Sequence, residues 1–200
     1  MITRFLIALA CTLLASCGKV PPLPALGPND TVLAFGDSLT HGTGAAPAQA
    51  YPAQLAALIG RKVVNAGIPG EISADGLTRL PDALEEHQPK LLIVCHGGND
   101  FLRKLGDDVA ASNVRAMIRL AQSKGIAVML MATPKPGLAV SAPKFYAEIA
   151  KEFAIPLEAD VLPDVLSDNS LKSDLVHPNA QGYQRMAEAL AKLMKKTKAI

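Results

Sequence analysis

Tryptophan is absent from this chain of 200 residues, and aromatic residues make up only 4% of it. Because 50% of the residues are nevertheless hydrophobic, a sizeable core must be built mainly from Ala, Leu, Ile and Val. Acidic and basic residues nearly balance, with a formal net charge of +2, and like charges form no long run. This charge pattern argues against nucleic acid as a partner, and the length predicts one domain.

The N-terminus has the features of a bacterial signal peptide. Arg4 precedes a mostly apolar stretch, 5–14, which is too short to cross a hydrocarbon core of roughly 30 Å. Leu14-Ala15-Ser16-Cys17 resembles a lipobox, so we expect residues 1–16 to be removed and Cys17 to be lipidated. Cleavage of an ordinary secretory signal near these small residues is the alternative. Gly18 follows the cysteine where an aspartate would favour the inner membrane, so we expect anchoring in the outer membrane of the cell envelope.

Cysteine is scarce, and this excludes several kinds of site. Cys11 would leave with the signal and Cys17 would be acylated, so Cys95 is the one remaining thiol and no internal disulfide is possible. Cys95 ends an apolar run and is expected in the core, not as a nucleophile. No Cys/His spacing resembles a zinc site, and phosphate-binding glycine loops are absent. We therefore expect neither a metal ion nor an organic cofactor.

Prolines gather just before the expected domain. Residues 17–30 contain Pro21, Pro22, Pro24 and Pro28, which predicts an extended, semi-rigid tether. At about 3.1 Å per residue, such a tether would hold the domain roughly 30 to 40 Å from an acyl anchor. The domain itself is predicted to occupy residues 31–200.

Short apolar runs alternate with helical patterns through this domain. The runs predict strands over 31–36, 62–66, 90–96, 126–132 and 155–158, and the patterns predict helices over 50–59, 74–86, 108–123, 142–153 and 179–196. Such alternation predicts an α/β protein with a parallel sheet of about five strands, covered by helices on both faces. Ser38, Gly70 and Asn99 each follow a strand, so we expect them at the carboxyl edge of the sheet, where crevices form.

Three side chains in these loops are suited to nucleophilic catalysis. A serine hydroxyl such as that of Ser38 needs a base to remove its proton. His177, just before the last helix, is the candidate base, and Asp174 is spaced to reach the other ring nitrogen. By itself, Asp-x-x-His-Pro is also typical of a turn with a helix cap. Of the other histidines, His41 is expected to line a turn or face solvent, and His96 to shape the rim of the site.

Four segments in this order resemble the SGNH/GDSL hydrolases, and among them the bacterial thioesterase I, arylesterase and lysophospholipase group. They are Phe35-Gly36-Asp37-Ser38-Leu39-Thr40, Asn65-Ala66-Gly67-Ile68-Pro69-Gly70, Gly97-Gly98-Asn99-Asp100 and Asp174-Leu175-Val176-His177-Pro178. The resemblance implies a flavodoxin-like three-layer α/β/α fold with Ser38, Asp174 and His177 as the catalytic residues. The Gly-x-Ser-x-Gly elbow of α/β-hydrolases is absent.

The same resemblance implies an oxyanion hole made of the Ser38 N–H, the Gly70 N–H and the Asn99 side chain. Gly67 is the alternative to Gly70, because the second segment offers two glycines. Asp37 and Asp100 are expected to support their loops by hydrogen bonding and not by proton transfer.

The implied activity is hydrolysis of carboxylic (thio)esters of acyl chains, such as aryl esters, acyl thioesters or lysophospholipids, through an acyl-enzyme. Phe101, Leu102 and Leu138 lie in loops at the same sheet edge and are expected to line an acyl groove; alternatively, Phe101 packs its loop against the domain. The expected partners are an ester substrate and a membrane through Cys17, and we expect a monomer. Two alternatives stay open: a carbohydrate or peptidoglycan O-acetylesterase, and a non-catalytic lipid-binding surface lipoprotein.

Overall fold

The computed structural model of the protein describes residues 20–137 and 140–200. The predicted signal peptide, the predicted lipidation site Cys17 and the candidate groove residue Leu138 lie outside the described residues.

Five parallel strands form the central sheet, in the spatial order β2-β1-β3-β4-β5. Their bounds are Thr31–Gly36 for β1, Lys62–Gly67 for β2, Leu91–Cys95 for β3, Ala127–Met131 for β4 and Leu157–Glu158 for β5. All five predicted strands are confirmed, with ends that differ by one or two residues at most.

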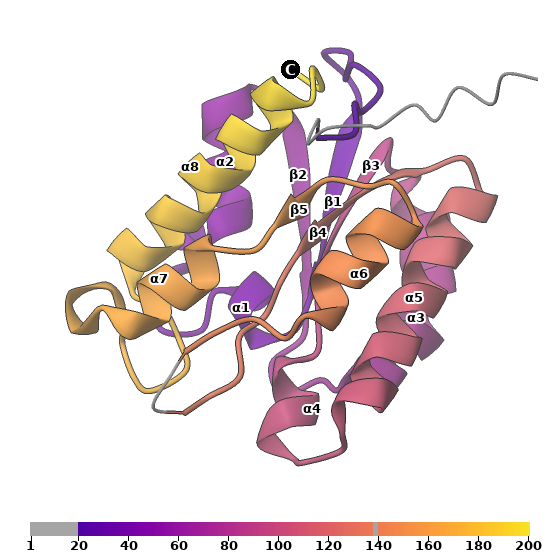
Figure 1. Cartoon of the computed structure of the whole chain (residues 1–200). Coiled ribbons are helices and arrows are strands. Elements are labelled where there is room, and N and C mark those ends of the chain that lie inside the picture. The colour runs from indigo at the N-terminus through magenta and orange to yellow at the C-terminus, as the bar shows by residue number, and fades with distance from the viewer. Residues whose placement is uncertain (1–19, 138–139) are drawn as a thin grey trace, which may run out of the picture.

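Helices cover both faces of this sheet (Figure 1). One face carries α2 (Tyr51–Ile59), α7 (Val161–Ser167) and α8 (Ala180–Lys196), and the other carries α3 (Ser73–His87), α5 (Asp107–Ser123) and α6 (Phe145–Glu152). The predicted three-layer α/β/α architecture is therefore confirmed.

The central strands are apolar on both sides, as a covered parallel sheet requires. In β1, Val32 and Ala34 pack into the hydrophobic cluster under α2 and α8, whereas Leu33 and Phe35 pack into the cluster under α3 and α5. Their side chains alternate between the two clusters because successive residues of a strand point to opposite faces. This double burial fixes β1, and with it the position at which Ser38 leaves the sheet.

Three helices were not predicted: α7, α1 (Ser38–His41) and α4 (Gly98–Leu102). Two short 3₁₀ turns, η1 (Pro47–Gln49) and η2 (Asn169–Leu171), complete the described elements. Helices of one or two turns are too short to show a hydrophobic period, which is the signal that identifies helices in a sequence. Two of these three helices begin just after the carboxyl end of a strand, α1 after β1 and α4 after β3, and they carry the predicted site residues Ser38 and Asn99.

The chain before β1 is packed onto the domain and does not form a free tether. Leu23 N donates to Thr197 O at 3.0 Å, and Leu26 N donates to Ala199 O at 2.8 Å. The Leu26 side chain is buried among the core residues around α8. The prediction of a free tether over 17–30 is therefore wrong from Leu23 onward, where the chain binds the domain beside the C-terminus (Figure 1).

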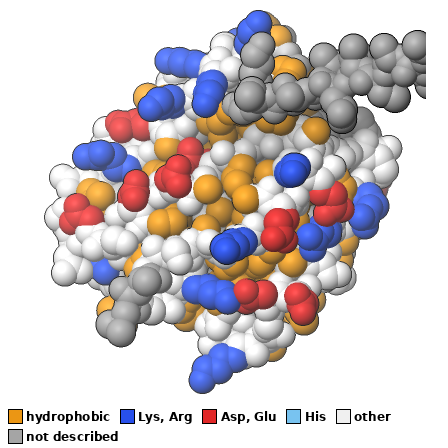
Figure 2. Space-filling model, viewed as in Figure 1, with side chains coloured by type: hydrophobic (Ala, Val, Ile, Leu, Met, Phe, Trp, Pro, Cys, Tyr) orange, Lys and Arg blue, Asp and Glu red, His pale blue; other side chains and the backbone are white. Residues whose placement is uncertain are grey.

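The surface carries charges of both signs. Figure 2 shows Lys and Arg interspersed with Asp and Glu around a central group of hydrophobic side chains between α8 and α6. In the part of the chain that the structure describes, no helix is both long and apolar enough to cross a membrane.

Candidate active site

Ser38 lies at the carboxyl edge of the sheet, as the first residue of α1. The preceding residue, Asp37, holds the turn between β1 and α1, because its Oδ1 accepts a hydrogen bond from the Leu39 N–H at 3.0 Å. Only 9% of Ser38 is exposed. Its hydroxyl is thus largely sheltered from solvent, at the sheet edge where the sequence predicts a crevice.

His177 and Asp174 complete a chain of contacts that begins at Ser38. His177 Nε2 lies 2.9 Å from Ser38 Oγ, and His177 Nδ1 lies 2.7 Å from Asp174 Oδ2. An ionised Asp174 is an acceptor only, so it fixes the tautomer in which Nδ1 carries the hydrogen and Nε2 faces the serine with its lone pair. The structure thus brings together the three residues that the sequence predicted as catalytic.

Asp174 is itself held by the backbone of its own loop. Its Oδ1 accepts hydrogen bonds from the N–H groups of Val176 at 2.8 Å and His177 at 2.9 Å. Partial burial raises the pKa of Asp174, but these two N–H groups and the imidazole outweigh it and keep the pKa below its ordinary value. The carboxylate therefore stays charged wherever the histidine can act as a base.

The two glycines proposed for the oxyanion hole differ in how their N–H groups are used. The Gly67 N–H donates to Asn65 Oδ1 at 3.0 Å. The Gly70 N–H donates to no other residue that the structure describes, and Gly70 has a φ of +77°, which favours glycine. Ser38 opens α1, so its N–H has no partner within that helix. The geometry favours Gly70 over Gly67 as the second backbone donor.

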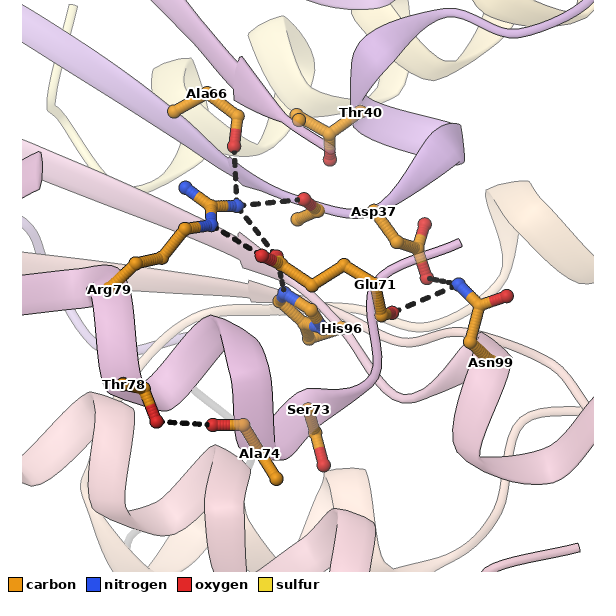
Figure 3. A network of polar contacts seen from close by, with 12 residues as sticks. Asp37, Thr40, Ala66, Glu71, Ser73, Ala74, Thr78, Arg79, His96 and Asn99 are labelled. Carbon is orange, nitrogen blue, oxygen red and sulfur yellow. Dashed lines mark hydrogen bonds and ion pairs between the residues drawn. The ribbon is translucent and has the colours of Figure 1, made fainter. Parts of the chain in front are cut away.

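Asn99, in α4, has its side-chain amide fixed by two acceptors (Figure 3). Its Nδ2 donates to Glu71 O at 3.0 Å and to Asp37 Oδ2 at 3.2 Å. Because both partners can only accept, Nδ2 and not Oδ1 must face them. Both hydrogens of the amide are therefore engaged, and the longer contact, to Asp37, is the one that a developing oxyanion would share.

Asp37 and Asp100 both support loops by hydrogen bonding, as predicted. Burial raises the pKa of Asp37 above its ordinary value, although His96 and the hydrogen bond from the Leu39 N–H act to lower it. Asp100 accepts hydrogen bonds from Ser73 N at 2.8 Å and Ser73 Oγ at 2.6 Å, and so ties α4 to the start of α3.

The remaining histidines do not compete with His177. His41 is exposed at the end of α1, as predicted. His96 is fully buried and contacts Glu71, so the prediction that it shapes the rim is wrong. The reason is that His96 directly follows the buried strand β3 and is covered by Gly76 of α3. Cys95 is buried as predicted, and burial raises the pKa of its thiol, which makes it a core residue.

An apolar cleft of about 420 Å³ opens beside Ser38. Asp37, Leu39 and Asn99 form the wall next to the serine. The other walls are mainly aliphatic side chains, among them Leu102, Val140, Leu166, Leu175 and Val176. Two lysines also line it, but Lys135 pairs with Asp107 and Lys172 donates to Leu166 O. The lining of the cleft is therefore mainly apolar.

The residues predicted to line an acyl groove have different positions in this structure. Leu102 lines the cleft. Phe101 is not among its lining residues; it packs against the core, with its ring 6.2 Å from that of Phe145 between centroids. The alternative expectation for Phe101, that it packs its loop, therefore fits the structure, because neighbouring residues of a short helix point in different directions. Leu138 lies outside the described residues.

Sequence reasoning missed two groups of residues around the site. Leu39, Leu175 and Val176 line the cleft, and the available signal was their position next to Ser38 and His177. Glu71, the residue after Gly70, forms an ion pair with Arg79. The spacing of these two residues in the sequence did not predict this pair.

A serine that contacts a histidine base, itself oriented by an aspartate, defines a serine hydrolase. Among the described residues, no group of three or more His, Cys, Asp or Glu side chains is arranged to hold a metal ion. The GDSL-like lipase/acylhydrolase family matches residues 34–185, and the chain belongs to that family.

Individual relatives agree with this assignment. The chain is 34% identical over 173 residues to thioesterase 1/protease 1/lysophospholipase L1 of Escherichia coli K12, covering 82% of each chain. It is 29% identical to the arylesterase of Vibrio mimicus, covering 82% of this chain and 87% of that one. The solved structure of TesA superimposes with a TM-score of 0.75 at 29% identity, covering 84% of this chain and 99% of that one. The protein is a serine ester hydrolase.

Proposed function

We propose that Ser38, His177 and Asp174 hydrolyse esters of medium or long acyl chains, and that the apolar cleft holds the chain. The observation that carries this proposal is the contact chain of 2.9 Å and 2.7 Å, whose serine stands between Asp37 and Leu39, two residues that line the cleft. A nucleophile, its base and an apolar cavity thus share one edge of the sheet.

The first half of the reaction forms an acyl-enzyme. Ser38 Oγ attacks the ester carbonyl while His177 Nε2 takes the hydroxyl proton, and the imidazolium is stabilised by Asp174. The carbonyl oxygen becomes negative and accepts hydrogen bonds from the N–H groups of Ser38 and Gly70 and from Asn99 Nδ2. The tetrahedral intermediate then collapses, and the leaving alkoxide or thiolate receives the proton from His177.

The second half releases the acid. A water molecule takes the place of the leaving group and gives its proton to His177 Nε2 as its oxygen attacks the acyl carbon. Collapse of this second intermediate breaks the bond to Ser38 Oγ, which regains the proton. No cofactor is required at any step.

The cleft supports a preference for chains longer than acetyl. Each buried methylene contributes about 0.8 kcal/mol, so an octanoyl chain that fills an aliphatic cleft of about 420 Å³ gains much more than acetyl. Comparing kcat/KM for acetyl and octanoyl nitrophenyl esters tests this directly. A preference for acetyl would instead favour the O-acetylesterase alternative, which uses the same catalytic residues.

We further propose that Cys17 is lipidated and that the active site faces away from the anchoring membrane. The support comes from α8, which starts three residues after His177 and ends beside the docked residue Leu23. Its 17 residues span about 25 Å. The chain between Cys17 and Leu23 reaches at most about 20 Å when extended. While Leu23 and Leu26 stay docked, this chain is too short for the domain to invert fully, with α8 perpendicular to the bilayer and the cleft against it.

This orientation favours esters that arrive from the aqueous side over lipids of the anchoring leaflet. Mass spectrometry of the mature N-terminus tests lipidation; an unmodified N-terminus, or cleavage away from Cys17, would contradict it. The lipoprotein is then reconstituted in vesicles, and a variant with a long Gly/Ser linker inserted after Gly18 serves as the comparison. We expect the linker to raise hydrolysis of an ester anchored in the same bilayer and to leave hydrolysis of a soluble octanoyl ester unchanged. Equal rates on the anchored ester without the linker would refute the orientation.

A further inference from the structure

A buried charged network lies directly behind the oxyanion loop, and the proton transfers described above do not use it. It consists of Glu71, Arg79 and His96 (Figure 3). We propose that these three are positioning residues, which hold the loop bearing Gly70 and the Glu71 carbonyl in the geometry that stabilises the oxyanion. The inference rests on the oxyanion roles of Gly70 and Asn99 proposed above.

Glu71 is the centre of the network and the residue next to Gly70. Its carboxylate accepts hydrogen bonds from Arg79 Nε at 2.6 Å and Arg79 Nη2 at 2.7 Å, a two-pronged pairing that fixes orientation as well as distance. The same carboxylate contacts His96 Nε2 at 3.0 Å. Only 5% of the Glu71 side chain is exposed, so these partners and not solvent determine its position.

Arg79 connects this carboxylate to the ends of two strands. From α3, its Nη2 also donates to Ala66 O at 2.9 Å, in β2, and to Gly36 O at 3.2 Å, at the end of β1. Its guanidinium lies 4.0 Å above the ring centroid of Phe35. One side chain therefore joins the strand that leads to Ser38, the strand that leads to Gly70, and the loop between Gly70 and α3.

His96 connects the network to a third strand, because it directly follows the end of β3. Because a carboxylate can only accept, His96 Nε2 carries the hydrogen, and Nδ1 has no hydrogen-bond partner among the described residues. The ring is confined by Gly76, where any larger residue would collide with it. The backbone carbonyl of His96 accepts a hydrogen bond from Tyr146 Oη at 2.6 Å. His96 thus cannot move without disturbing both α3 and α6.

The network reaches the reacting atoms through one backbone carbonyl. Glu71 O accepts the hydrogen bond from Asn99 Nδ2, and Glu71 N directly follows Gly70. A shift of Glu71 therefore moves two of the three proposed oxyanion donors together. Buried ion pairs add little to stability compared with apolar packing, so a fixed geometry is the benefit that this arrangement offers.

The test replaces both charged partners, Glu71→Gln with Arg79→Met, so that no buried charge is left unpaired. We expect kcat to fall tenfold or more with KM changed less than threefold, because small displacements of transition-state donors affect kcat most. The matched control is Arg115→Met, which removes the ion pair between α5 and α6 at 2.7 Å and should leave kcat unchanged. If the double variant does not fold, Arg79→Lys keeps the charge but loses the two-pronged pairing and should still lower kcat.

A double-mutant cycle, which combines each network variant with Asn99→Ala, separates a positioning role from a general structural effect. If the network acts through Asn99, its variants should cost clearly less kcat in the Asn99→Ala background than in the wild type. Unchanged kcat in the network variants, or losses that simply multiply, would overturn the inference while leaving the proposed mechanism intact. Unchanged kcat in Asn99→Ala itself would overturn the oxyanion role of Asn99 and this inference with it.

Discussion

His177 Nε2 lies 2.9 Å from Ser38 Oγ, although the two residues are 139 positions apart in the chain. The contact depends on the turn that carries His177. Asp174 binds the backbone N–H of His177 as well as its ring, and Ser173 N donates to His177 O at 2.9 Å. The histidine is thus held by its own loop before it meets the serine, so substitutions at either residue can test the chemistry without disturbing the core.

Ser38→Ala and His177→Ala should each abolish most ester hydrolysis while the protein stays folded. The nucleophile and its base act as a unit, so the double variant should be hardly slower than either single variant. Turnover of a nitrophenyl ester, measured beside the melting temperature, checks this. Near-normal turnover by Ser38→Ala, with contaminating esterases excluded by a fluorophosphonate label, would rule out the serine mechanism.

Asn99→Ala should lower kcat far more than it raises KM. The oxyanion exists only in the transition state, and loss of one such donor costs on the order of 3 kcal/mol, or about a hundredfold or more in rate. Steady-state kinetics with a soluble octanoyl ester measures the split. A change in KM alone would make Asn99 a ground-state binding residue.

Glu71 should make stability depend on pH in the acid range. Burial raises the pKa of Glu71, but the hydrogen bonds from His96 and Arg79 outweigh it and hold the pKa below its ordinary value of 4.5. Its contribution is therefore fully present above pH 4.5 and is lost as pH falls through the lowered value. At pH 7, Glu71→Gln should reduce the free energy of unfolding by about 1 to 3 kcal/mol.

Denaturant unfolding of wild type and Glu71→Gln between pH 7 and pH 3 measures this difference, which should shrink toward the acid end. Glu152→Gln, from the exposed pair with Arg115, is the control and should change stability by less than about 1 kcal/mol. A difference for Glu71→Gln that stays constant down to pH 3 would contradict the assignment.

The sheet and the catalytic residues could be predicted because both depend on short, local sequence patterns. The strands are continuous apolar runs, and Ser38, Gly70 and Asn99 follow them directly, so parallel topology alone brings them to one edge. The docking of Leu23 and Leu26 was not predictable in this way, because it depends on where α8 ends. Nor was the burial of His96, which is decided by Gly76 on a different element. Contacts between distant segments leave no periodic signal in either partner.

Acyl-chain selectivity should depend on Leu102 and not on its neighbours. Leu102 is 48% exposed and lines the cleft beside Asn99, whereas Leu105 is similarly exposed, at 41%, in the same segment but outside the cleft. Leu102→Ala removes apolar surface that only a long chain reaches, so it should lower kcat/KM for octanoyl esters by about fivefold to twentyfold, at about 25 cal/mol per Å² lost. Leu105→Ala is the matched control and should leave kcat/KM unchanged for both acetyl and octanoyl esters.

Phe101→Ala separates the cleft from the loop that carries it. Because Phe101 packs against the core near Phe145, its loss should loosen α4 and lower kcat/KM for acetyl and octanoyl esters by the same factor. The ratio of the two kcat/KM values, octanoyl over acetyl, is the quantity to compare across the three variants. It should fall for Leu102→Ala alone; a fall for Phe101→Ala instead would place the acyl chain on the Phe101 side of α4, outside the cleft next to Ser38.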